Sequence, residues 1–414
     1  MRQPRHERTH LTIARGFDPL PAALPEPSVK PATRNHTART GTREQSLENP
    51  VQRMIALLGR KDVPTDGVED YCTFLGEALL RRGVELKKVR VEWRDRGCVR
   101  SLLQLWREAA DWRGQWVLLQ FTSLGWSRRG FPFATVAVIA IVRSRGARTG
   151  VFYHEPFGYD GGRRIDQVRR VCQEWVLRQL YDLTEKSIFA DPLEKIPWLP
   201  PNSSKAVSIP IGASLPEPSP MPDRLSAQNG SPKTVAIYCV GELPYRAFEL
   251  EDISRAVAPL AANGLKLRVV FLGRGTPEAQ AEIEQAFRSI PVELLNLGIR
   301  SAAEVSSALA QSDAMLCVRG RLFPRRSSAL AGIACGVPIV AYAGAAEGTP
   351  LAAAGIELVP YRDAAALSRS LGRILEDREH WEKLHRRSLQ AQKKYFCWNA
   401  IAENFVGALG LKGN

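Results

Sequence analysis

The chain has 414 residues, 44% of them hydrophobic, and a formal net charge of +14 at pH 7. This length predicts two domains with extensions, and the apolar share is enough for each domain to bury a full core. Seven cysteines occur without a CxxC pair, which argues against a disulfide framework or a zinc site and fits a reducing compartment.

The N-terminus is polar and has no apolar segment of the kind that a signal peptide requires. The longest apolar run, residues 134–142, is far shorter than the roughly 20 residues of a membrane-spanning helix. Residues 81–170 alone carry a net charge of +11. We therefore expect a soluble, cytoplasmic protein with an anionic partner: a phospholipid surface at the inner face of the membrane, a lipid-phosphate acceptor or nucleic acid. An ordinary solvated surface is the alternative.

The first half of the chain predicts strands that alternate with helices. Residues 1–49 lack apolar periodicity and predict a disordered basic tail. The elements that follow are strand 53–59, helix 68–83, strands 84–92 and 116–122, helix 131–146, strand 148–156, helix 164–181, strand 186–190 and a last strand-like piece at 207–214.

The second half repeats this alternation after a Pro-, Ser- and Gly-rich segment, 216–232, that predicts a linker. The predicted strands are 233–241, 265–273, 292–298, 313–318 and 337–342. The predicted helices are 248–264, 276–290, 301–312, 327–336, 363–377 and 398–409. His380, Trp381 and His385 lie in a Lys-, Arg- and Glu-rich region and are interpreted as solvated helix faces.

Strands that alternate with helices predict parallel, doubly wound sheets. We expect two Rossmann-like α/β domains that face each other across a cleft, with ligands at the carboxyl ends of the strands. The predicted division is a tail (1–49), an N-terminal acceptor domain (50–215), a linker (216–232), a C-terminal donor domain (233–392) and a C-terminal helix (393–414).

Several segments resemble glycosyltransferase family 4. In the second half, LRVVFLGRG is similar to the family's strand and glycine-containing loop, and ALAGIACGVPIVAY is similar to its E-A-M-A-C-G-x-P-V-V-A segment. YFCWNAIAENF is similar to its closing helix, which in this fold packs back on the N-terminal domain. In the first half, DGVEDYCTFLGEALLRRGVEL resembles the family's G-G-V-E-R opening. The resemblance covers most of residues 51–409 and implies the GT-B fold and retaining transfer of a sugar from a nucleotide-sugar.

The sequence departs from the family pattern at the donor site. The two positions that usually hold glutamates are Phe323 and Ala331. Neither side chain accepts the hydroxyl hydrogen bonds of a carboxylate. The arginine of the family's first C-domain loop aligns with Glu242, and its lysine is at best replaced by Arg246. We therefore expect either a rearranged donor site or a loss of catalysis.

The segment VRGRLFPRRSSALAGIACG occupies the family's donor loop. Pro324 ends the preceding strand or loop, and Ser327 or Ser328 is a candidate N-cap for the next helix. A helix N-terminus attracts phosphate. Four arginines surround this end, namely Arg319, Arg321, Arg325 and Arg326. We expect them to hold the donor diphosphate in place of a metal, so that no metal or other cofactor is needed; a solvated arginine cluster is the alternative.

His154 and Glu155 follow the predicted strand 148–156 and are the candidate catalytic residues. The resemblance implies that a histidine here contacts the sugar or the donor phosphate. By its chemistry, His154 can donate to a developing charge or accept the proton of an acceptor hydroxyl, and Glu155 can do the second job. A structural histidine at the end of a strand is the alternative.

The remaining candidate residues follow other strands. Asp66 and Gly67 open the first helix, where Asp66 is either an N-cap or an acceptor ligand. Four candidate donor-binding residues are Gly241 and Arg246 in the first C-domain loop and Gly273 and Arg274 in the second. Glu347, after the strand 337–342, is a candidate replacement for the carboxylate missing at Ala331. Surface or structural roles remain open for each of them.

The leading hypothesis is therefore a metal-independent glycosyltransferase that uses a nucleotide-sugar and a glycan, polysaccharide or lipid-linked acceptor. The first alternative is a non-catalytic GT-B protein that binds a nucleotide-sugar or glycan as a regulator or scaffold. A nucleic-acid binder is a second alternative, although no sequence pattern of a nucleic-acid-binding domain accompanies the charge. A GT-B epimerase is a third.

Overall fold

The structure, a computed structural model, describes residues 52–412 except 63–65, 92, 94–96, 217, 219–230, 244 and 347. The predicted tail, most of the predicted linker and the candidate residue Glu347 lie outside the described residues. The chain folds into two parallel sheets of six strands each, and both sheets belong to one compact unit.

The first sheet has the strand order β2-β1-β3-β4-β5-β6, and every pair in it is parallel. Its strands are β1 (Gln52–Leu58), β2 (Val84–Arg90), β3 (Trp116–Phe121), β4 (Arg148–Tyr153), β5 (Lys186–Phe189) and β6 (Ala206–Ser208). Its helices are α1 (Gly67–Leu80), α3 (Cys98–Glu108), α4 (Ser123–Trp126), α5 (Ala134–Ser144) and α6 (Arg164–Leu183), with 3-10 turns at Ala109–Trp112 and Leu193–Lys195.

The second sheet has the order β12-β11-β10-β7-β8-β9 and is also parallel. Its strands are β7 (Lys233–Tyr238), β8 (Leu267–Leu272), β9 (Glu293–Gly298), β10 (Ala314–Arg321), β11 (Ile339–Tyr342) and β12 (Ile356–Val359). Its helices are α7 (Tyr245–Ala262), α8 (Gln280–Phe287), α9 (Ala302–Ala310), α10 (Ser327–Ala334), α11 (Ala364–Glu376) and α12 (Arg378–Ala391). A 3-10 turn covers Pro350–Ala353, and a π-helical turn, Gln392–Phe396, leads into α13 (Trp398–Leu409).

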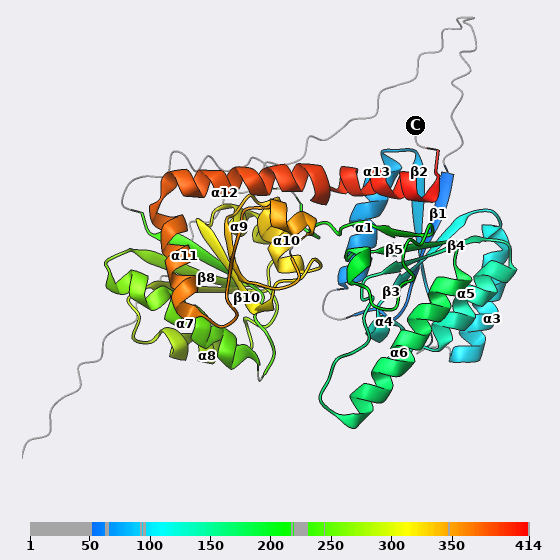
Figure 1. Cartoon of the computed structure of the whole chain (residues 1–414), viewed down its shortest axis with the longest axis horizontal. Helices are drawn as coiled ribbons and strands as arrows, with labels where there is room; N and C mark the ends of the chain where they lie inside the picture. The colour runs from blue at the N-terminus through cyan, green and yellow to red at the C-terminus, as the bar shows by residue number, and fades with distance from the viewer. Residues whose placement is uncertain are drawn as a thin grey trace, which may run out of the picture. The chain divides into compact units, whose positions relative to one another are not determined.

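Each sheet is covered on both faces, which is why its strands are nearly continuous apolar runs. In β1, Ile55 and Leu57 pack in one core with α3, α5 and α6, whereas Met54 and Ala56 pack in another with α1 and α13. Figure 1 shows these two helix layers on opposite faces of the first sheet. The alternation of side chains along a strand produces this division. The doubly wound architecture that the sequence predicts is therefore confirmed.

The strand orders fix where each sheet can hold a ligand. In both sheets the order reverses direction next to the first strand, between β1 and β3 and between β7 and β10. The loops leaving the two strands at such a point diverge to opposite faces, which opens a crevice at their carboxyl ends. Gly59 and Thr122 lie at this point of the first sheet. In the second sheet Gly241 follows β7, and Arg319 lies near the end of β10.

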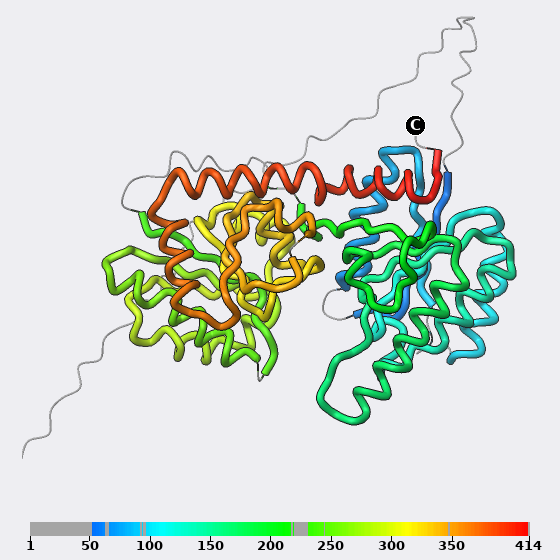
Figure 2. The backbone as a smooth tube through the Cα atoms, in the orientation of Figure 1, coloured from blue at the N-terminus to red at the C-terminus, as the bar shows by residue number. Residues whose placement is uncertain are grey.

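The last three helices of the chain connect the two cores. Figure 2 follows the chain, orange to red, through α11 and α12 into α13. Helix α12 packs against α10 and α11, whereas α13 packs against α1. Trp398 donates from Nε1 to the carbonyl of Ala213 (2.9 Å), and Trp116 of β3 donates to the carbonyl of Leu409 (2.9 Å). The C-terminal residues thus complete the core of the first sheet.

The structure corrects the interpretation of the region around Trp381. This side chain is buried in the core of the second sheet, stacks on His385 and donates from Nε1 to the carbonyl of Asp313 (2.7 Å). His380 pairs with Glu357 (2.6 Å). These residues are not a solvated helix face, because α12 turns them toward β12 and the helix–strand junctions. Helices α3 and α12 and strand β12 have no counterpart with residue bounds among the predicted elements.

Candidate functional site

Several of the predicted site residues line one cavity of about 460 Å³ at the carboxyl ends of β1, β3 and β4. We call it the His154 cavity. Six predicted residues line it, namely Asp66, Gly67, His154, Glu155, Arg274 and Ser327. Four of them come from the first sheet and two from the second. The cavity therefore lies at the position that the strand order of the first sheet assigns to a ligand.

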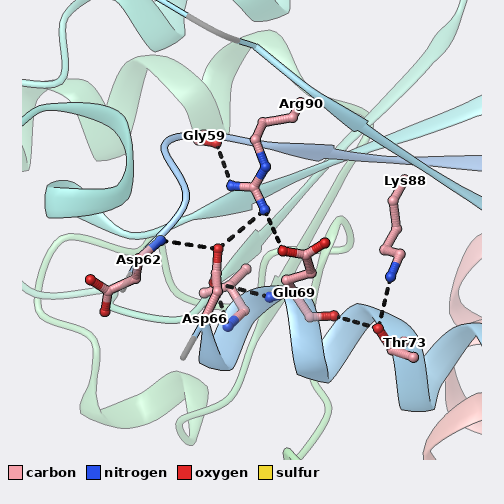
Figure 3. A network of polar contacts seen from close by, with 8 residues as sticks. Gly59, Asp62, Asp66, Glu69, Thr73, Lys88 and Arg90 are labelled. Atoms are coloured by element: carbon pink, nitrogen blue, oxygen red, sulfur yellow. Dashed lines mark hydrogen bonds and ion pairs between the residues drawn. The ribbon is translucent and has the colours of Figure 1, made fainter. Parts of the chain in front are cut away.

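Asp66 holds together the loop between β1 and α1 (Figure 3). Its Oδ1 accepts hydrogen bonds from the backbone of Val68 and Glu69 (both 3.1 Å), so it is the N-cap of α1. Its Oδ2 pairs with Arg90 (3.1 Å), and Arg90 also donates to the carbonyl of Gly59 (2.8 Å). The capping role is thus present in the structure, and the same carboxylate lines the cavity.

His154 follows β4 and lies among aromatic rings. Its ring contacts Phe152 and Tyr71 at centroid distances of 4.5 and 5.1 Å, and its Nε2 lies 3.0 Å from Oε1 of Gln120. Burial and the nearby Arg325 charge lower the pKa of His154 to about 3. The imidazole is therefore neutral at pH 7. A group with this pKa accepts a proton poorly, which leaves hydrogen bonding as the chemistry that His154 offers.

Arg325 links the loop before α10 to the first sheet. Its Nε lies 2.6 Å from Oδ2 of Asp191, and both side chains are largely buried. Its Nη1 donates to the backbone carbonyl of His154 (2.8 Å). Burial raises the pKa of Asp191, and the Arg325 guanidinium opposes that rise. The guanidinium of Arg325 thus forms its ion pair and hydrogen bond within the protein, and it holds the backbone at the end of β4, where His154 lies.

The N-terminus of α10 differs in detail from the prediction. The N-cap is Arg326, which makes no capping hydrogen bond with its side chain, and Ser327 is the first helical residue. Ser328 lies inside, with Oγ 3.5 Å from Sγ of Cys317. Neither serine is the N-cap, because the chain becomes helical one residue earlier than a serine cap requires. The N-cap side chain consequently leaves the first backbone N–H groups of the helix without a capping hydrogen bond.

The ring of Phe323 contacts two arginines of this loop. The guanidinium carbons of Arg325 and Arg326 lie over its ring, 5.3 and 4.2 Å from the centroid. Arg326 also donates to the carbonyl of Arg321 (3.4 Å), and burial lowers the pKa of Arg326. An aromatic ring attracts cations through its face. The ring of Phe323 thus contacts two guanidinium groups and does not neutralise their charge.

The loop after β7 is occupied by internal contacts. Oε2 of the buried Glu249 accepts the backbone N–H of Gly241 (2.8 Å). Arg246 donates to the carbonyls of Gly241 (3.0 Å) and Glu278 (3.2 Å) and pairs with Glu282 (3.2 Å). Burial raises the pKa of Glu249, while Arg319 and Arg326 are among the charges that oppose the rise. Gly241 and Arg246 do not line the His154 cavity, nor a second cavity beside it that contains Arg128 and Arg129.

The loop after β8 needs both of its glycines. Gly273 and Gly275 have φ angles of 93° and 81°. A Cβ on Gly275 would lie 2.3 Å from the carbonyl oxygen of Val240. This tight turn presents Arg274, which lies 3.9 Å from Asp62 of the first sheet and lines the His154 cavity.

Several residues of the site carry no prediction from the sequence. Arg90, Gln120 and Thr122 line the His154 cavity, and Asp191 pairs with Arg325. Gln120 is the next-to-last residue of β3 and Asp191 follows β5. The rule that ligands gather at the carboxyl ends of parallel strands is therefore the signal that finds them. Six of the predicted residues line neither the His154 cavity nor the second cavity beside it, namely Gly241, Arg246, Gly273, Arg319, Arg326 and Ser328.

The described residues contain neither a candidate metal site nor a candidate membrane span. No group of three or more His, Cys, Asp or Glu side chains there has an arrangement that could hold a metal ion. No helix in that part of the chain combines the length and the apolar character of a membrane span.

Sequence comparison identifies one domain. Residues 234–377 match the family model described as glycosyl transferases group 1. These residues include all of β7 except its first residue, β8 to β12 and the loop before α10. No curated protein sequence matches the chain.

Comparison of structures extends the likeness to both sheets. Sucrose-phosphate synthase from Thermosynechococcus elongatus matches with a TM-score of 0.62 and 17% identity, over 87% of this chain and 98% of that one. Anabaena HepE, solved with UDP and glucose, matches with a TM-score of 0.61 and 12% identity, over 87% and 99%. An E. coli trehalose-6-phosphate structure with bound UDP-2-fluoro glucose matches with a TM-score of 0.56 and 13% identity, over 87% and 99%. The fold is therefore GT-B, as the sequence predicts.

Proposed function

We propose that the protein is a glycosyltransferase that moves a sugar from a nucleotide-sugar to an acceptor hydroxyl. The observation that carries this proposal is the His154 cavity, where residues of both sheets meet at the ends of parallel strands. Further support comes from the group 1 domain at residues 234–377 and from similar structures that contain UDP. An enzyme of this kind needs a cavity of this size to exclude water from the transfer step.

The chemistry requires charge stabilisation at the leaving diphosphate. The acceptor oxygen forms a bond to the anomeric carbon, and the bond from that carbon to the diphosphate oxygen breaks with its electrons remaining on the diphosphate. We infer that Arg274 and the uncapped backbone N–H groups of α10 bind the diphosphate. They would take the role that a metal has in other transferases. The acceptor proton passes to Glu155 or to the diphosphate.

A thermal-shift screen tests the donor site. The wild-type protein is heated with UDP, GDP and ADP and with their sugar derivatives, because a ligand that binds only the folded state raises the Tm. We expect one base to raise the Tm and Arg274→Ala to reduce that rise strongly. Arg288→Ala is the matched control, since Arg288 is an exposed arginine of the same half that does not line the cavity.

Sugar transfer itself is tested with the donor that the screen identifies. Release of the nucleoside diphosphate in the presence of a mixed glycan or polyprenyl-phosphate acceptor extract, absent in Arg274→Ala, would support the enzyme. Stable nucleotide binding without any release would instead favour a non-catalytic role. Anomeric NMR of the product decides whether the configuration is retained, as we propose.

We also infer that the first domain contacts an anionic membrane surface. Helices α3, α5 and α6 lie side by side (Figure 1), and several large apolar side chains on them or next to them are exposed. These side chains are Val99, Leu103, Trp106, Phe133, Val168, Val171 and Trp175. Exposed arginines flank them, namely Arg100, Arg107, Arg164 and Arg178. Apolar residues bordered by arginines favour the interface of a bilayer that contains acidic lipids.

Vesicle co-sedimentation tests this contact. We expect the protein to bind vesicles that contain phosphatidylglycerol, to bind pure phosphatidylcholine weakly, and to be released by salt. The double variant Val168→Asp/Val171→Asp should lose binding, whereas Ile299→Asp, an exposed apolar residue of the other half, should not. Equal binding of the three proteins would contradict the proposed surface.

A further inference from the structure

A second cavity of about 460 Å³ adjoins the His154 cavity and shares Leu124 and Glu155 with it. We call it the Arg128 cavity. It is lined by cations and aromatic rings, including those of Arg128, Arg129, Tyr159, Arg169 and Arg325. The site residues predicted from the sequence do not include Arg128, Arg129, Tyr159 or Arg169.

Two of the four arginines are already neutralised by the protein. Arg169 lies 2.6 Å from Asp166, and Arg325 lies 2.6 Å from Asp191. Arg128 and Arg129 are exposed, and no carboxylate of the described residues pairs with either of them. Glu155 is a carboxylate that lines the same cavity, and its Oε2 accepts the backbone N–H of Ser123 (3.3 Å). Arg128 and Arg129 therefore form no ion pair within the described part of the chain. A guanidinium pairs best with a carboxylate or a phosphate, often through two hydrogen bonds.

Ser123 provides a second, independent observation. Ser123 lines the cavity and is 5% exposed. Its hydroxyl oxygen is buried and has no hydrogen-bond partner among the described residues. A buried hydroxyl without a partner is costly. An oxyanion bound in the cavity would supply the missing partner. The lining of the cavity thus combines a buried hydroxyl without a partner among the described residues and two arginines that form no ion pair there.

We propose that the Arg128 cavity binds the phosphate group of a phosphorylated acceptor. This inference rests on the proposed function, and it names the acceptor class of that site. Arg128, Arg129 and Ser123 hold the phosphate, and the acceptor extends past Glu155 into the His154 cavity. Because Glu155 lines both cavities, the acceptor hydroxyl next to it faces the sugar to be transferred. The phosphate belongs either to a soluble sugar phosphate or to a lipid phosphate.

Isothermal titration calorimetry on the full chain tests the site. Glucose 6-phosphate is the soluble probe, and a polyprenyl phosphate in phosphatidylcholine vesicles is the membrane-borne probe. Glucose and the same vesicles without the phosphate are their controls. We expect saturable binding of at least one phosphorylated probe. Binding of the soluble probe identifies a sugar phosphate as the source, and binding of the vesicle probe alone identifies a lipid phosphate.

The double variant Arg128→Ala/Arg129→Ala should weaken that binding about tenfold or more, because it removes two charge-assisted contacts. Its charge-matched control is Lys266→Ala/Arg300→Ala, which removes two exposed cations of the other half and should leave binding unchanged. Unchanged binding in the first variant, equal loss in both variants, or no saturable binding of either probe would overturn the proposal.

The nucleotide response separates this inference from the proposed function. Arg128→Ala/Arg129→Ala should keep the wild-type Tm rise with the nucleoside diphosphate, since neither arginine lines the His154 cavity. If the nucleoside diphosphate raises the Tm but neither phosphorylated probe binds, the proposed acceptor subsite is wrong and the proposed function stands. If a phosphorylated probe binds but no nucleotide raises the Tm, the proposed function is wrong and the cavity is only an anion site.

Discussion

At the scale of single residues, Arg325 has a different role from the one that its sequence position suggests. Its guanidinium pairs with Asp191 at 2.6 Å and holds the carbonyl of His154. We expect Arg325→Ala to reduce the free energy of unfolding by about 3 kcal/mol, because it leaves a buried carboxylate unpaired. Thermal unfolding of Arg325→Ala, Asp191→Asn and the double variant measures the coupling. Strictly additive losses would mean that the pair does not matter for stability.

His154 makes stability depend on pH in a defined window. Its pKa is about 3 in the folded protein and about 6.5 in the unfolded chain. Between these values the unfolded state binds more protons, so stability is complete above pH 6.5 and decreases as the pH falls toward 3. We expect His154→Gln to reduce this acid sensitivity. The measurement is the Tm difference between wild type and variant from pH 7 to pH 4, and a constant difference would refute the expectation.

At the scale of elements, the β1–α1 loop depends on one carboxylate. Asp66 caps α1 and pairs with Arg90, which in turn holds Gly59. Asp66→Asn should keep the cap and lose the charge of the pair, whereas Asp66→Ala should lose both. We expect the alanine variant to be less stable than the asparagine variant by about 1 kcal/mol. Urea unfolding compares the two, and equal stabilities would show that the cap contributes nothing.

Helix α3 shows why some elements escape sequence analysis. Only Ser101 and Leu105 of this helix are buried, while Val99, Leu103 and Trp106 are exposed. Its apolar residues therefore do not mark a core-facing stripe, which is the signal that periodicity detects. In contrast, Tyr71, Leu75 and Leu79 of α1 are all buried, and their spacing predicts that helix directly.

At the scale of the whole molecule, the C-terminal helix stabilises the opposite end of the chain. Phe405 of α13 is fully buried in one core with Met54 and Leu75. We expect Phe405→Ala to cost about 3–5 kcal/mol through the cavity it creates. Hydrogen exchange should show lost protection in α1 and β1 and retained protection in β7 to β11. Asn404→Ala, an exposed neighbour, is the control; a uniform loss over both sheets would contradict this localisation.

The sequence by itself determined the order of the elements and the parallel, doubly wound architecture, because local periodicity and turn residues carry that information. It also predicts Asp66, His154, Glu155, Arg274 and Ser327 as site residues, since each follows a strand or begins a helix at the edge where ligands bind. In the structure these five residues line the His154 cavity.

Only the tertiary structure decided which side chains meet. Arg325 pairs with Asp191, Glu249 holds Gly241, and two arginines lie over Phe323. The partners in the first pair are more than 130 positions apart in the chain, so no local pattern relates them. Packing between distant elements also gave Arg246 its internal contacts. Among the described residues no carboxylate pairs with Arg128 or Arg129. Arginines that form no ion pair within the protein, such as Arg128 and Arg129 among the described residues, stay available to bind an anion.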